Sequence, residues 1–428
     1  MRKISVIIIG AGNRGDRYAG LMHNTPDQYE IVGMADPDPA RRAHFQKDYG
    51  VPEENCFSCW EEILAQPKMA DVAVIATVDN MHYQPALMAI DKGYNLLLEK
   101  PVAQTAQQCA DIANAAREKG VDVLVCHVLR YTPFYGKVKE LLMQGVVGEV
   151  ISIDQVEAIG NVHFSHSYVR GNWHKESDST PMLLAKSCHD LDIIQWLLDK
   201  PCKQVSSFGS LTHFVPKNAP EGAPKRCADG TCPAYDTCPY NVIKHYYDFK
   251  ENPRRQIITK GIAKEYTATD EEVMTALKTT DYGLCAYHCD NDVVDHQVVN
   301  MEFEGGATAT LTVNAFNKGG RYIRVYGTKG ELYAHMKENE IKIYSFQTNE
   351  VMVVSTAKAD ETINGGHGGG DQGIIKELYE YLSGSYAGFR AADVDISVRN
   401  HMIGFAAEKA RHERSVVDVE EMLNEYGM

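Results

Sequence analysis

The residues best suited to chemistry begin with a glycine turn near the start of this 428-residue chain. Gly10, Gly12 and Gly15 have the spacing G-x-G-x-x-G, which permits a tight turn, close approach of the backbone to a pyrophosphate, and close packing of a helix on a strand. The N–H groups that begin the following helix can bind phosphate oxygens. Asp36 lies 21 residues after Gly15, where an acidic side chain can bind ribose hydroxyls. Together these residues predict a dinucleotide site.

The residues around Asp36 bear on which dinucleotide is bound. Asp36 can accept hydrogen bonds from the adenosine ribose of NAD and would repel the 2′-phosphate of NADP. Arg41 and Arg42 follow closely, and an arginine there can accommodate that phosphate. We expect NAD, with the arginines as solvated helix charges, and the alternative stays open at Arg41.

Lys100, Lys186 and His189 are candidates for handling protons and charge. Lys100 comes in Glu99-Lys100-Pro101, just after a predicted buried strand, where a lysine is usually a solvated charge. His189 carries an imidazole that titrates near neutral pH, as a general base requires. Lys186 lies one helical turn before His189, so both can face one site. In the alternative interpretation, His189 is a hydrogen-bonded core residue and Lys186 a surface charge.

The elements that must position these residues alternate between apolar strands and helices. Such alternation implies βαβ crossovers and a doubly wound parallel sheet. The pattern is complete by about residue 128, which predicts a Rossmann domain over residues 1–128. Its expected strands are 4–9, 30–35, 71–76, 94–98 and 121–126, and its expected helices include 39–48, 82–92 and 105–119.

Beyond residue 128 the pattern changes to longer runs that alternate apolar with polar residues. Such runs suit an antiparallel sheet with one exposed face. We therefore expect a C-terminal α/β domain over 129–428 with a large, open, mostly antiparallel sheet. Its expected strands are 149–159, 203–214, 294–303, 307–316, 321–327, 331–335 and 340–345, and its expected helices include 134–144, 371–383 and 394–411.

Composition excludes several classes of partner. The chain has 58 acidic against 43 basic side chains and a net charge of −15, so it would repel nucleic acid and anionic membranes. No apolar stretch is long enough to span a bilayer. Eleven cysteines, an odd number in a long chain, suit a reducing compartment. We expect a cytoplasmic protein whose partner is a small molecule.

Several motifs occur in one order along the whole chain: GAGNRG at 10–15, ATVDNMH at 76–82, LLLEKPVA at 96–103, LRYTP at 129–133 and KSCHDLD at 186–192. In these the chain resembles the Gfo/Idh/MocA family, named for glucose–fructose oxidoreductase, inositol dehydrogenase and a rhizopine-catabolism protein. The resemblance implies hydride transfer between a nicotinamide and a secondary alcohol of a sugar or polyol. It also implies a homodimer or homotetramer formed through the open sheet.

The resemblance assigns roles to individual residues. Lys100 would polarise the substrate hydroxyl, with Pro101 shaping the turn, and His189 would act as general base. Thr77, Asp79 and His82 correspond to a loop that borders the cofactor. In all, the residues expected to contact the cofactor are Gly10, Gly12, Asn13, Arg14, Gly15, Asp36, Arg41, Thr77, Asp79, His82, Glu99, Lys100 and Arg130.

The chain departs from the family at the catalytic helix. Many members carry Asp-x-x-x-His, but the position four before His189 is Ala185, followed by Lys186. A lysine with a lowered pKa can replace or help the base. The departure leaves two alternatives to a dehydrogenase: a redox-neutral glycosidase or lyase that oxidises its substrate transiently, and a non-catalytic NAD sensor. Intact Lys100 and His189 argue against the sensor.

Polar and aromatic side chains before this helix suit carbohydrate recognition. Aromatic rings can stack on a sugar face while polar groups bind hydroxyls, although an ordinary surface loop is equally consistent with the pattern. The glycine-rich segment 365–371 is expected to be a flexible loop that contacts substrate, with Asp371 capping the next helix. The expected substrate residues are Tyr131, His166, Arg170, Trp173 and His367.

A segment at about 216–245 is rich in proline, glycine and cysteine and reads as an irregular insertion. Its Cys227, Cys232 and Cys238 could hold a structural zinc ion with a distant fourth ligand. Their spacing differs from the common C-x2-C knuckle. Free thiols and an oxidised pair therefore remain alternatives to zinc.

Overall fold

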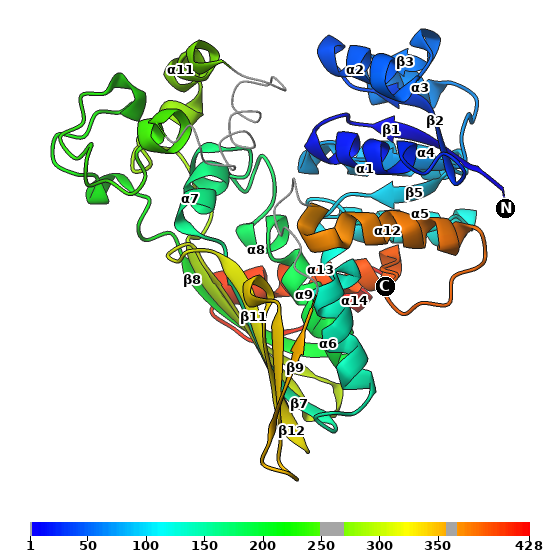
Figure 1. Cartoon of the computed structure of the whole chain (residues 1–428), viewed down its shortest axis with the longest axis vertical. Helices are drawn as coiled ribbons and strands as arrows, with labels where there is room; N and C mark the ends of the chain where they lie inside the picture. The colour runs from blue at the N-terminus through cyan, green and yellow to red at the C-terminus, as the bar shows by residue number, and fades with distance from the viewer. Residues whose placement is uncertain (1, 249–268, 357–365) are drawn as a thin grey trace.

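The computed structural model describes residues 2–248, 269–356 and 366–428. Two sheets dominate it, one of six strands and one of nine. In Figure 1 the six-stranded sheet and its helices form the upper right of the molecule, and the nine-stranded sheet extends below. A Rossmann sheet joined to an α/β domain with a large open sheet is the predicted fold class, and the structure confirms it.

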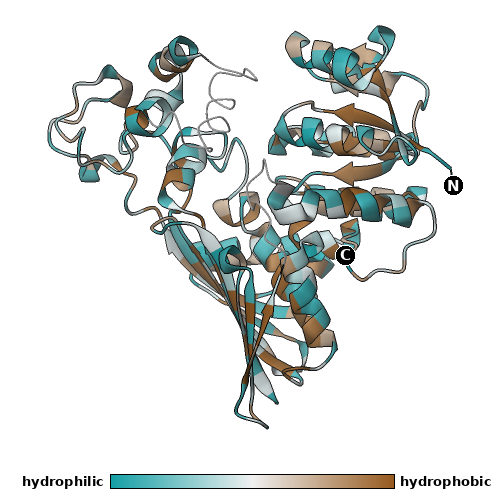
Figure 2. Cartoon of the chain, viewed as in Figure 1, coloured by the Kyte–Doolittle hydropathy of each residue, from teal (hydrophilic) through white to brown (hydrophobic). Residues whose placement is uncertain are grey.

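The six-stranded sheet has the order β3-β2-β1-β4-β5-β6, with all strands parallel. Its central strands are almost continuously buried, because helices cover both faces. Figure 2 shows these strands as the most hydrophobic segments of the domain. The strands are β1 Ile4–Ile9, β2 Tyr29–Ala35, β3 Cys56–Phe57, β4 Val72–Ile75, β5 Asn95–Leu98 and β6 Val123–Val125. The helices are α1 Asn13–His23, α2 Pro39–Tyr49, α3 Trp60–Ala65, α4 Tyr83–Asp91 and α5 Ala106–Lys119.

The nine-stranded sheet has the order β14-β13-β12-β11-β7-β10-β9-β8-β15. Only the β10–β7 pair is parallel among the strand pairs described. The strands are β7 Val150–Ala158, β8 Cys202–Ser210, β9 His296–Phe303, β10 Thr308–Asn314, β11 Gly320–Gly327, β12 Gly330–His335, β13 Glu340–Ser345, β14 Val351–Ser355 and β15 Val417–Asp418.

Helices pack on one face of this sheet. They include α9 Cys188–Leu198 against β7 and β10, and α13 Val394–Glu413 with α14 Val419–Glu425 against β8. Burial alternates along the strands, so the opposite face stays partly exposed. The remaining helices of this region are α6 Pro133–Met143, α7 Asn161–Phe164, the π-helical turn η4 Ser165–Arg170, and α8 Met182–Ala185.

One late helix returns to the Rossmann domain. Helix α12, Gly366–Leu382, buries Ile374, Ile375 and Leu378 in the same core as β1 and β2. The Tyr29 hydroxyl donates a hydrogen bond to the carbonyl oxygen of Ile375 at 2.7 Å. The division at residue 128 stays a prediction, to which the structure adds this C-terminal contribution.

The predicted insertion has little regular structure. Short turns at Pro216–Asn218, Cys227–Asp229 and Ile243–Asp248 precede helix α11, Asp270–Thr279. The turns Cys227–Asp229 and Ile243–Asp248 share a small core with α11, formed by Ala228, Val242, Ile243, Tyr246, Val273, Ala276 and Leu277. Within the described ranges, no helix combines the length and apolar character needed to cross a membrane.

Candidate active site

The glycine turn between β1 and α1 has the geometry of a dinucleotide cradle. A Cβ atom on Gly15 would lie 1.9 Å from the Gly10 carbonyl oxygen, and one on Gly10 would lie 2.6 Å from that of Ala76. Gly12 is different, because a Cβ there would meet only the Arg41 guanidinium at 3.7 Å. Gly12 offers α1 no side-chain cap, so the N–H groups of Asn13 and its neighbours are available to phosphate oxygens. The residues present therefore fit NAD.

Asp36 lies at the end of β2 beside this turn and is almost fully buried. Its carboxylate accepts hydrogen bonds from the backbone N–H of Ala11 at 2.8 Å and of Asp38 at 2.9 Å. Arg41 also approaches it at 3.2 Å, whereas Arg42 binds the backbone carbonyls of Asp36 and Pro37. Asp36 is thus held where it can meet a ribose, with Arg41 alongside.

Arg14 links the glycine turn to the segment after β5 that contains Lys100. Its guanidinium donates to Glu99 at 2.7 Å and to both carboxylate oxygens of Asp371 at 2.9 and 3.1 Å. The Tyr18 hydroxyl donates to the same Glu99 oxygen at 2.7 Å. Asp371 was expected to cap a helix, but its carboxylate binds Arg14 in this cluster. The Nδ1 atom of His367 lies 3.1 Å from the same carboxylate. The cluster fixes the turn, the end of β5 and the start of α12 together.

His367 belongs to a left-handed turn rather than to a simple loop. His367, Gly368 and Gly369 all have positive φ values, at 49°, 67° and 89°. The Nδ1 atom of His367 lies 3.3 Å from Arg14, so the ring is anchored at the cofactor side. Of the predicted flexible segment, Gly365 lies outside the described residues. A substrate role for His367 stays a prediction.

Lys100 lies two residues after the end of β5, at the edge where the carboxyl ends of the parallel strands meet. Its Nζ atom donates a hydrogen bond to the carbonyl oxygen of Ala185 at 2.8 Å. Ala185 is the position at which the resemblance to the family implies a carboxylate. The Lys100 ammonium therefore reaches across to the segment that leads into the predicted catalytic helix.

His189 lies in the first turn of α9 and is 7% exposed. Burial, followed by the nearby positive charge of Lys100, holds the pKa of this imidazole well below its usual range. Its Nδ1 atom is buried and has no hydrogen-bond partner among the described residues. Its ring meets that of His127 edge-on, with centroids 5.8 Å apart. The pKa of His189 thus departs from the value near neutral pH expected of a general base, and the shift favours the neutral imidazole.

Lys186 is placed in a charged cluster that the sequence did not indicate. Its Nζ lies 3.5 Å from Glu157 of β7, and Glu157 lies 2.5 Å from Arg321 of β11. Arg321 also pairs with Asp190 at 3.0 Å. Burial lowers the pKa of Lys186 and raises that of Glu157. Glu157, Asp190 and Arg321 are additions to the predicted site.

The loop after β4 joins the two domains. The Asp79 carboxylate accepts hydrogen bonds from the Trp173 indole N–H at 3.0 Å and from the Ser179 hydroxyl at 2.7 Å. The His82 ring contacts the carbonyl oxygen of Pro101 at 2.7 Å. Asp79, a predicted cofactor residue, therefore contacts Trp173, a predicted substrate residue. Thr77, which begins the loop, donates its hydroxyl to the carbonyl oxygen of Met81.

Arg130 and Tyr131 lie in a buried turn after β6. Nε and Nη2 of Arg130 donate to the two carboxylate oxygens of Asp192, each at 2.7 Å, in a pair that is almost fully buried. Burial raises the pKa of Tyr131, whose hydroxyl has no hydrogen-bond partner among the described residues. The observed partner of Arg130 is a structural one, and its predicted cofactor contact stays a prediction.

His166 and Arg170, from η4, face the insertion. His166 stacks on Tyr282 with ring centroids 4.9 Å apart and contacts the Tyr246 hydroxyl at 3.0 Å. Arg170 donates to the carbonyl oxygens of Leu284 and Tyr240, each at 2.9 Å. These contacts attach the insertion to the second domain, and no contact described brings either residue to Lys100 or His189.

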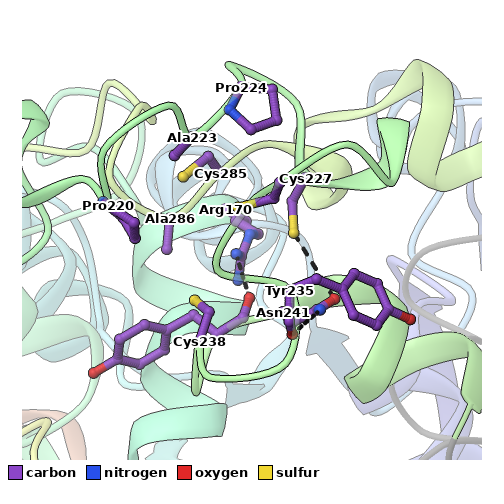
Figure 3. Close-up of a pocket in the computed structure, with 12 residues that line it drawn as sticks. Arg170, Pro220, Ala223, Pro224, Cys227, Tyr235, Cys238, Asn241, Cys285 and Ala286 are labelled. Carbon is purple, nitrogen blue, oxygen red and sulfur yellow. Dashed lines mark hydrogen bonds between the residues drawn. The ribbon is translucent and has the colours of Figure 1, made fainter.

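The cysteines of the insertion gather around Arg170 (Figure 3). Cys227, Cys232, Cys238 and Cys285 line one small pocket with it. All eleven cysteines of the chain are free. Within the described ranges, no group of three or more His, Cys, Asp or Glu side chains is arranged to hold a metal ion. The guanidinium places a positive charge among the thiols, so the structure does not support the predicted structural zinc.

A Rossmann domain with a glycine cradle, joined to an α/β domain that supplies a neutral histidine, defines the class of two-domain, NAD-dependent oxidoreductases. Residues 4–127 match the model of the oxidoreductase family with an NAD-binding Rossmann fold, GFO_IDH_MocA. Residues 139–391 match the C-terminal alpha/beta domain of the same oxidoreductase family. The chain belongs to the Gfo/Idh/MocA family, and the resemblance predicted from its motifs is confirmed.

Individual relatives support this assignment. The chain is 27% identical over 397 residues to YteT of Bacillus subtilis, named as an oxidoreductase, with 86% of this chain and 88% of that protein covered. It is 25% identical over 211 residues to 2,7-anhydro-N-acetylneuraminate hydratase of Escherichia coli, covering 49% of this chain and 54% of that protein. A levoglucosan dehydrogenase solved with NADH and levoglucosan has the same fold, with a TM-score of 0.69, 15% identity and 98% and 100% of the two chains covered.

Proposed function

We propose that the protein is an NAD-dependent dehydrogenase that oxidises a secondary alcohol of a sugar, polyol or derivative. The observation that carries the proposal is that Lys100 lies beside a buried, neutral His189 at the edge of the sheet that bears the glycine cradle. Names of relatives supply the substrate class, because they include an inositol dehydrogenase and a levoglucosan dehydrogenase.

Lys100, His189 and Asp79 would have separate roles in the reaction. The Lys100 ammonium polarises the hydroxyl and stabilises negative charge on its oxygen. His189, whose buried Nδ1 atom has no hydrogen-bond partner among the described residues, accepts the hydroxyl proton. A dinucleotide held at Gly10, Gly12 and Gly15 would supply the hydride acceptor. Asp79, held against Trp173 and Ser179, keeps the two domains aligned around the reacting atoms.

NAD, rather than NADP, remains our preferred cofactor. The buried Asp36 carboxylate at the end of β2 supports this choice, since it would face the 2′-phosphate of NADP. Arg41, paired with that carboxylate, is the residue that could reverse the preference. Direct contacts from Arg14, Glu99 and Arg130 are the least supported, because each side chain already has a protein partner.

A redox-neutral glycosidase or lyase is the second candidate. It is favoured by the absence of a carboxylate at Ala185, by the Lys186–Glu157 pair, and by the relatives named as hydratases. Such an enzyme would return the hydride after elimination, so no net change in cofactor would accumulate. The sensor alternative finds no support in a site that retains both Lys100 and His189.

The test is to identify what the purified protein holds and what it oxidises. Denatured protein is examined by mass spectrometry for released NAD, NADH or NADP. The native protein is then mixed with NAD and with inositols, levoglucosan and 2,7-anhydro-N-acetylneuraminate, and NADH absorbance is recorded. Accumulating NADH supports the dehydrogenase, and substrate loss without NADH supports the second candidate. A protein that neither holds nor binds a nicotinamide cofactor would overturn both.

The partly exposed face of the nine-stranded sheet, with Phe208 65% exposed, supports the predicted homodimer or homotetramer. The eleven free cysteines support the predicted cytoplasmic location.

A further inference from the structure

The inner face of the nine-stranded sheet changes from apolar to charged toward one end. Along β7, Ile153 is followed by Gln155 and Glu157, all at most 2% exposed. On the antiparallel strand β11, Arg321 comes two residues before the fully buried Ile323 and lies directly opposite Glu157. Burying charged side chains between a sheet and a helix costs folding free energy. A buried charged layer of this kind marks a candidate functional site.

Glu157 stands at the centre of this layer. Its Oε2 atom lies 2.5 Å from Nε of Arg321, and its Oε1 atom lies 3.5 Å from Nζ of Lys186. Arg321 is shared with Asp190, at 3.0 Å. Asp190 also accepts a hydrogen bond from Gln155 at 2.9 Å. The two carboxylates therefore face two cations, and each oxygen of Glu157 faces a different one.

The groups around Lys186 come from several elements. Glu157 from β7 and Asp190 from α9 favour the charged amine, whereas Arg321 from β11 and Lys100 at the end of β5 oppose it. Tyr168 from η4 and Tyr135 from α6 lie on the Glu157 side of the layer. Burial lowers the pKa of Lys186 and raises that of Glu157, which brings the two proton affinities closer together.

We propose that Glu157 is a positioning residue that holds the Lys186 amine in the active site and sets its proton affinity, so that Lys186 serves as a proton acceptor besides His189. The step moves one proton: the lone pair of the neutral amine takes it from the substrate, and the electron pair of the broken bond stays on the substrate. The Glu157 carboxylate balances the ammonium that forms. The proposal rests on the proposed function for its substrate, but the pairing itself can be tested without one.

The first experiment measures the amine directly. The whole protein with NAD is reductively methylated with carbon-13 formaldehyde, and its methyllysine resonances are followed against pH, with Lys186→Met identifying one signal. We expect that signal to titrate below the exposed lysines. Glu157→Gln should move its midpoint lower by about one pH unit, because the variant removes a favourable charge worth about 1.4 kcal/mol. Equal midpoints in the two proteins would overturn the proposal.

Two variants control for a structural effect. Glu408→Gln removes another buried glutamate paired with an arginine, Arg411, and should leave the Lys186 signal where it is. Glu157→Asp keeps the charge and should restore much of the midpoint, which keeps the test decisive if Glu157→Gln unfolds. A similar displacement in Glu408→Gln would mean that the change is general, and would count against the proposal.

The second experiment measures turnover of inositol, or of whichever panel compound reacts fastest. Since the active amine is neutral, a lower proton affinity should move the acidic limb of the kcat profile to lower pH in Glu157→Gln, with KM little changed. In a Lys186→Met background the same substitution should move nothing further. A uniform fall in kcat with an unmoved limb would overturn the proposal. If no panel compound reacts, the proposed function fails while the resonance midpoints still decide the pairing.

Discussion

The two sides of the candidate site are built in different ways. On the cofactor side, Gly10, Gly12 and Gly15 act through backbone geometry within a single turn. On the substrate side, Glu157, Lys186 and Arg321 act through side chains that a sheet and a helix bring together. The cofactor side depends on glycines that lack a Cβ atom, whereas the substrate side depends on the balance of buried charges. The two sides should therefore fail under different substitutions.

The largest effect should come from removing the cation that serves two buried carboxylates. Arg321→Met leaves Glu157 and Asp190 without their shared partner and should lower the free energy of unfolding by about 3–5 kcal/mol. Urea denaturation followed by circular dichroism measures the change. The control is Arg324→Met on the same strand, where the side chain is exposed and stacks on Tyr333. If both variants lose the same stability, burial of charge is not what distinguishes the substrate side.

The contrast also explains what the sequence could predict. The glycine turn and the parallel strands β1, β2, β4, β5 and β6 follow from patterns within about 10 residues, so their place and type were predicted. The two-residue strand β3 carries too short a pattern and was missed. The partnership of Glu157 with Arg321 spans the register of two strands and has no local signal. The same is true of Arg14 with Asp371 and of Arg130 with Asp192. Residue type indicated which side chains could do chemistry, but their partners depend on tertiary packing.

A substitution at the meeting point of the two sides separates catalysis from stability. Lys100→Met should lower kcat by about 10²–10³-fold, since it removes the charge that stabilises the developing alkoxide. The fold should be retained, because the ammonium has a single backbone acceptor, Ala185, among the hydrogen bonds described. Steady-state kinetics and thermal denaturation check the two expectations. Lys119→Met, which changes an exposed lysine, is the control. Full activity in Lys100→Met would remove the lysine from the mechanism.

His166 should make the second domain sensitive to acid. Burial lowers the pKa of His166 to about 4, below the value of about 6.5 expected when the chain is unfolded. The unfolded state therefore binds the extra proton first, and the folded protein loses stability as pH falls from about 6.5 to 4. His166→Phe, which keeps a ring against Tyr282, should reduce this loss by about 3 kcal/mol at pH 4. Unfolding measured at pH 7 and pH 4 tests it, and an unchanged difference between the two pH values would contradict it.

The smallest effect on stability, and the sharpest test of the contrast, comes from adding one methyl group to each of two glycines. Gly15→Ala places a Cβ 1.9 Å from the Gly10 carbonyl oxygen and should cost about 1–3 kcal/mol of folding stability, because the turn must open. Gly12→Ala meets only the movable Arg41 at 3.7 Å, so its unfolding should match that of the wild type.

Gly12→Ala, which should leave stability unchanged, should weaken cofactor binding. The Gly12 methyl would occupy space that the pyrophosphate needs, so calorimetric titration should show NAD binding at least about tenfold weaker in a protein of unchanged stability. Unimpaired binding by Gly12→Ala would mean that the dinucleotide does not cross the turn at this residue. The open space beside Gly12 would then have no part in binding. Cofactor affinity would depend on Asp36 and Arg41 more than on the glycines.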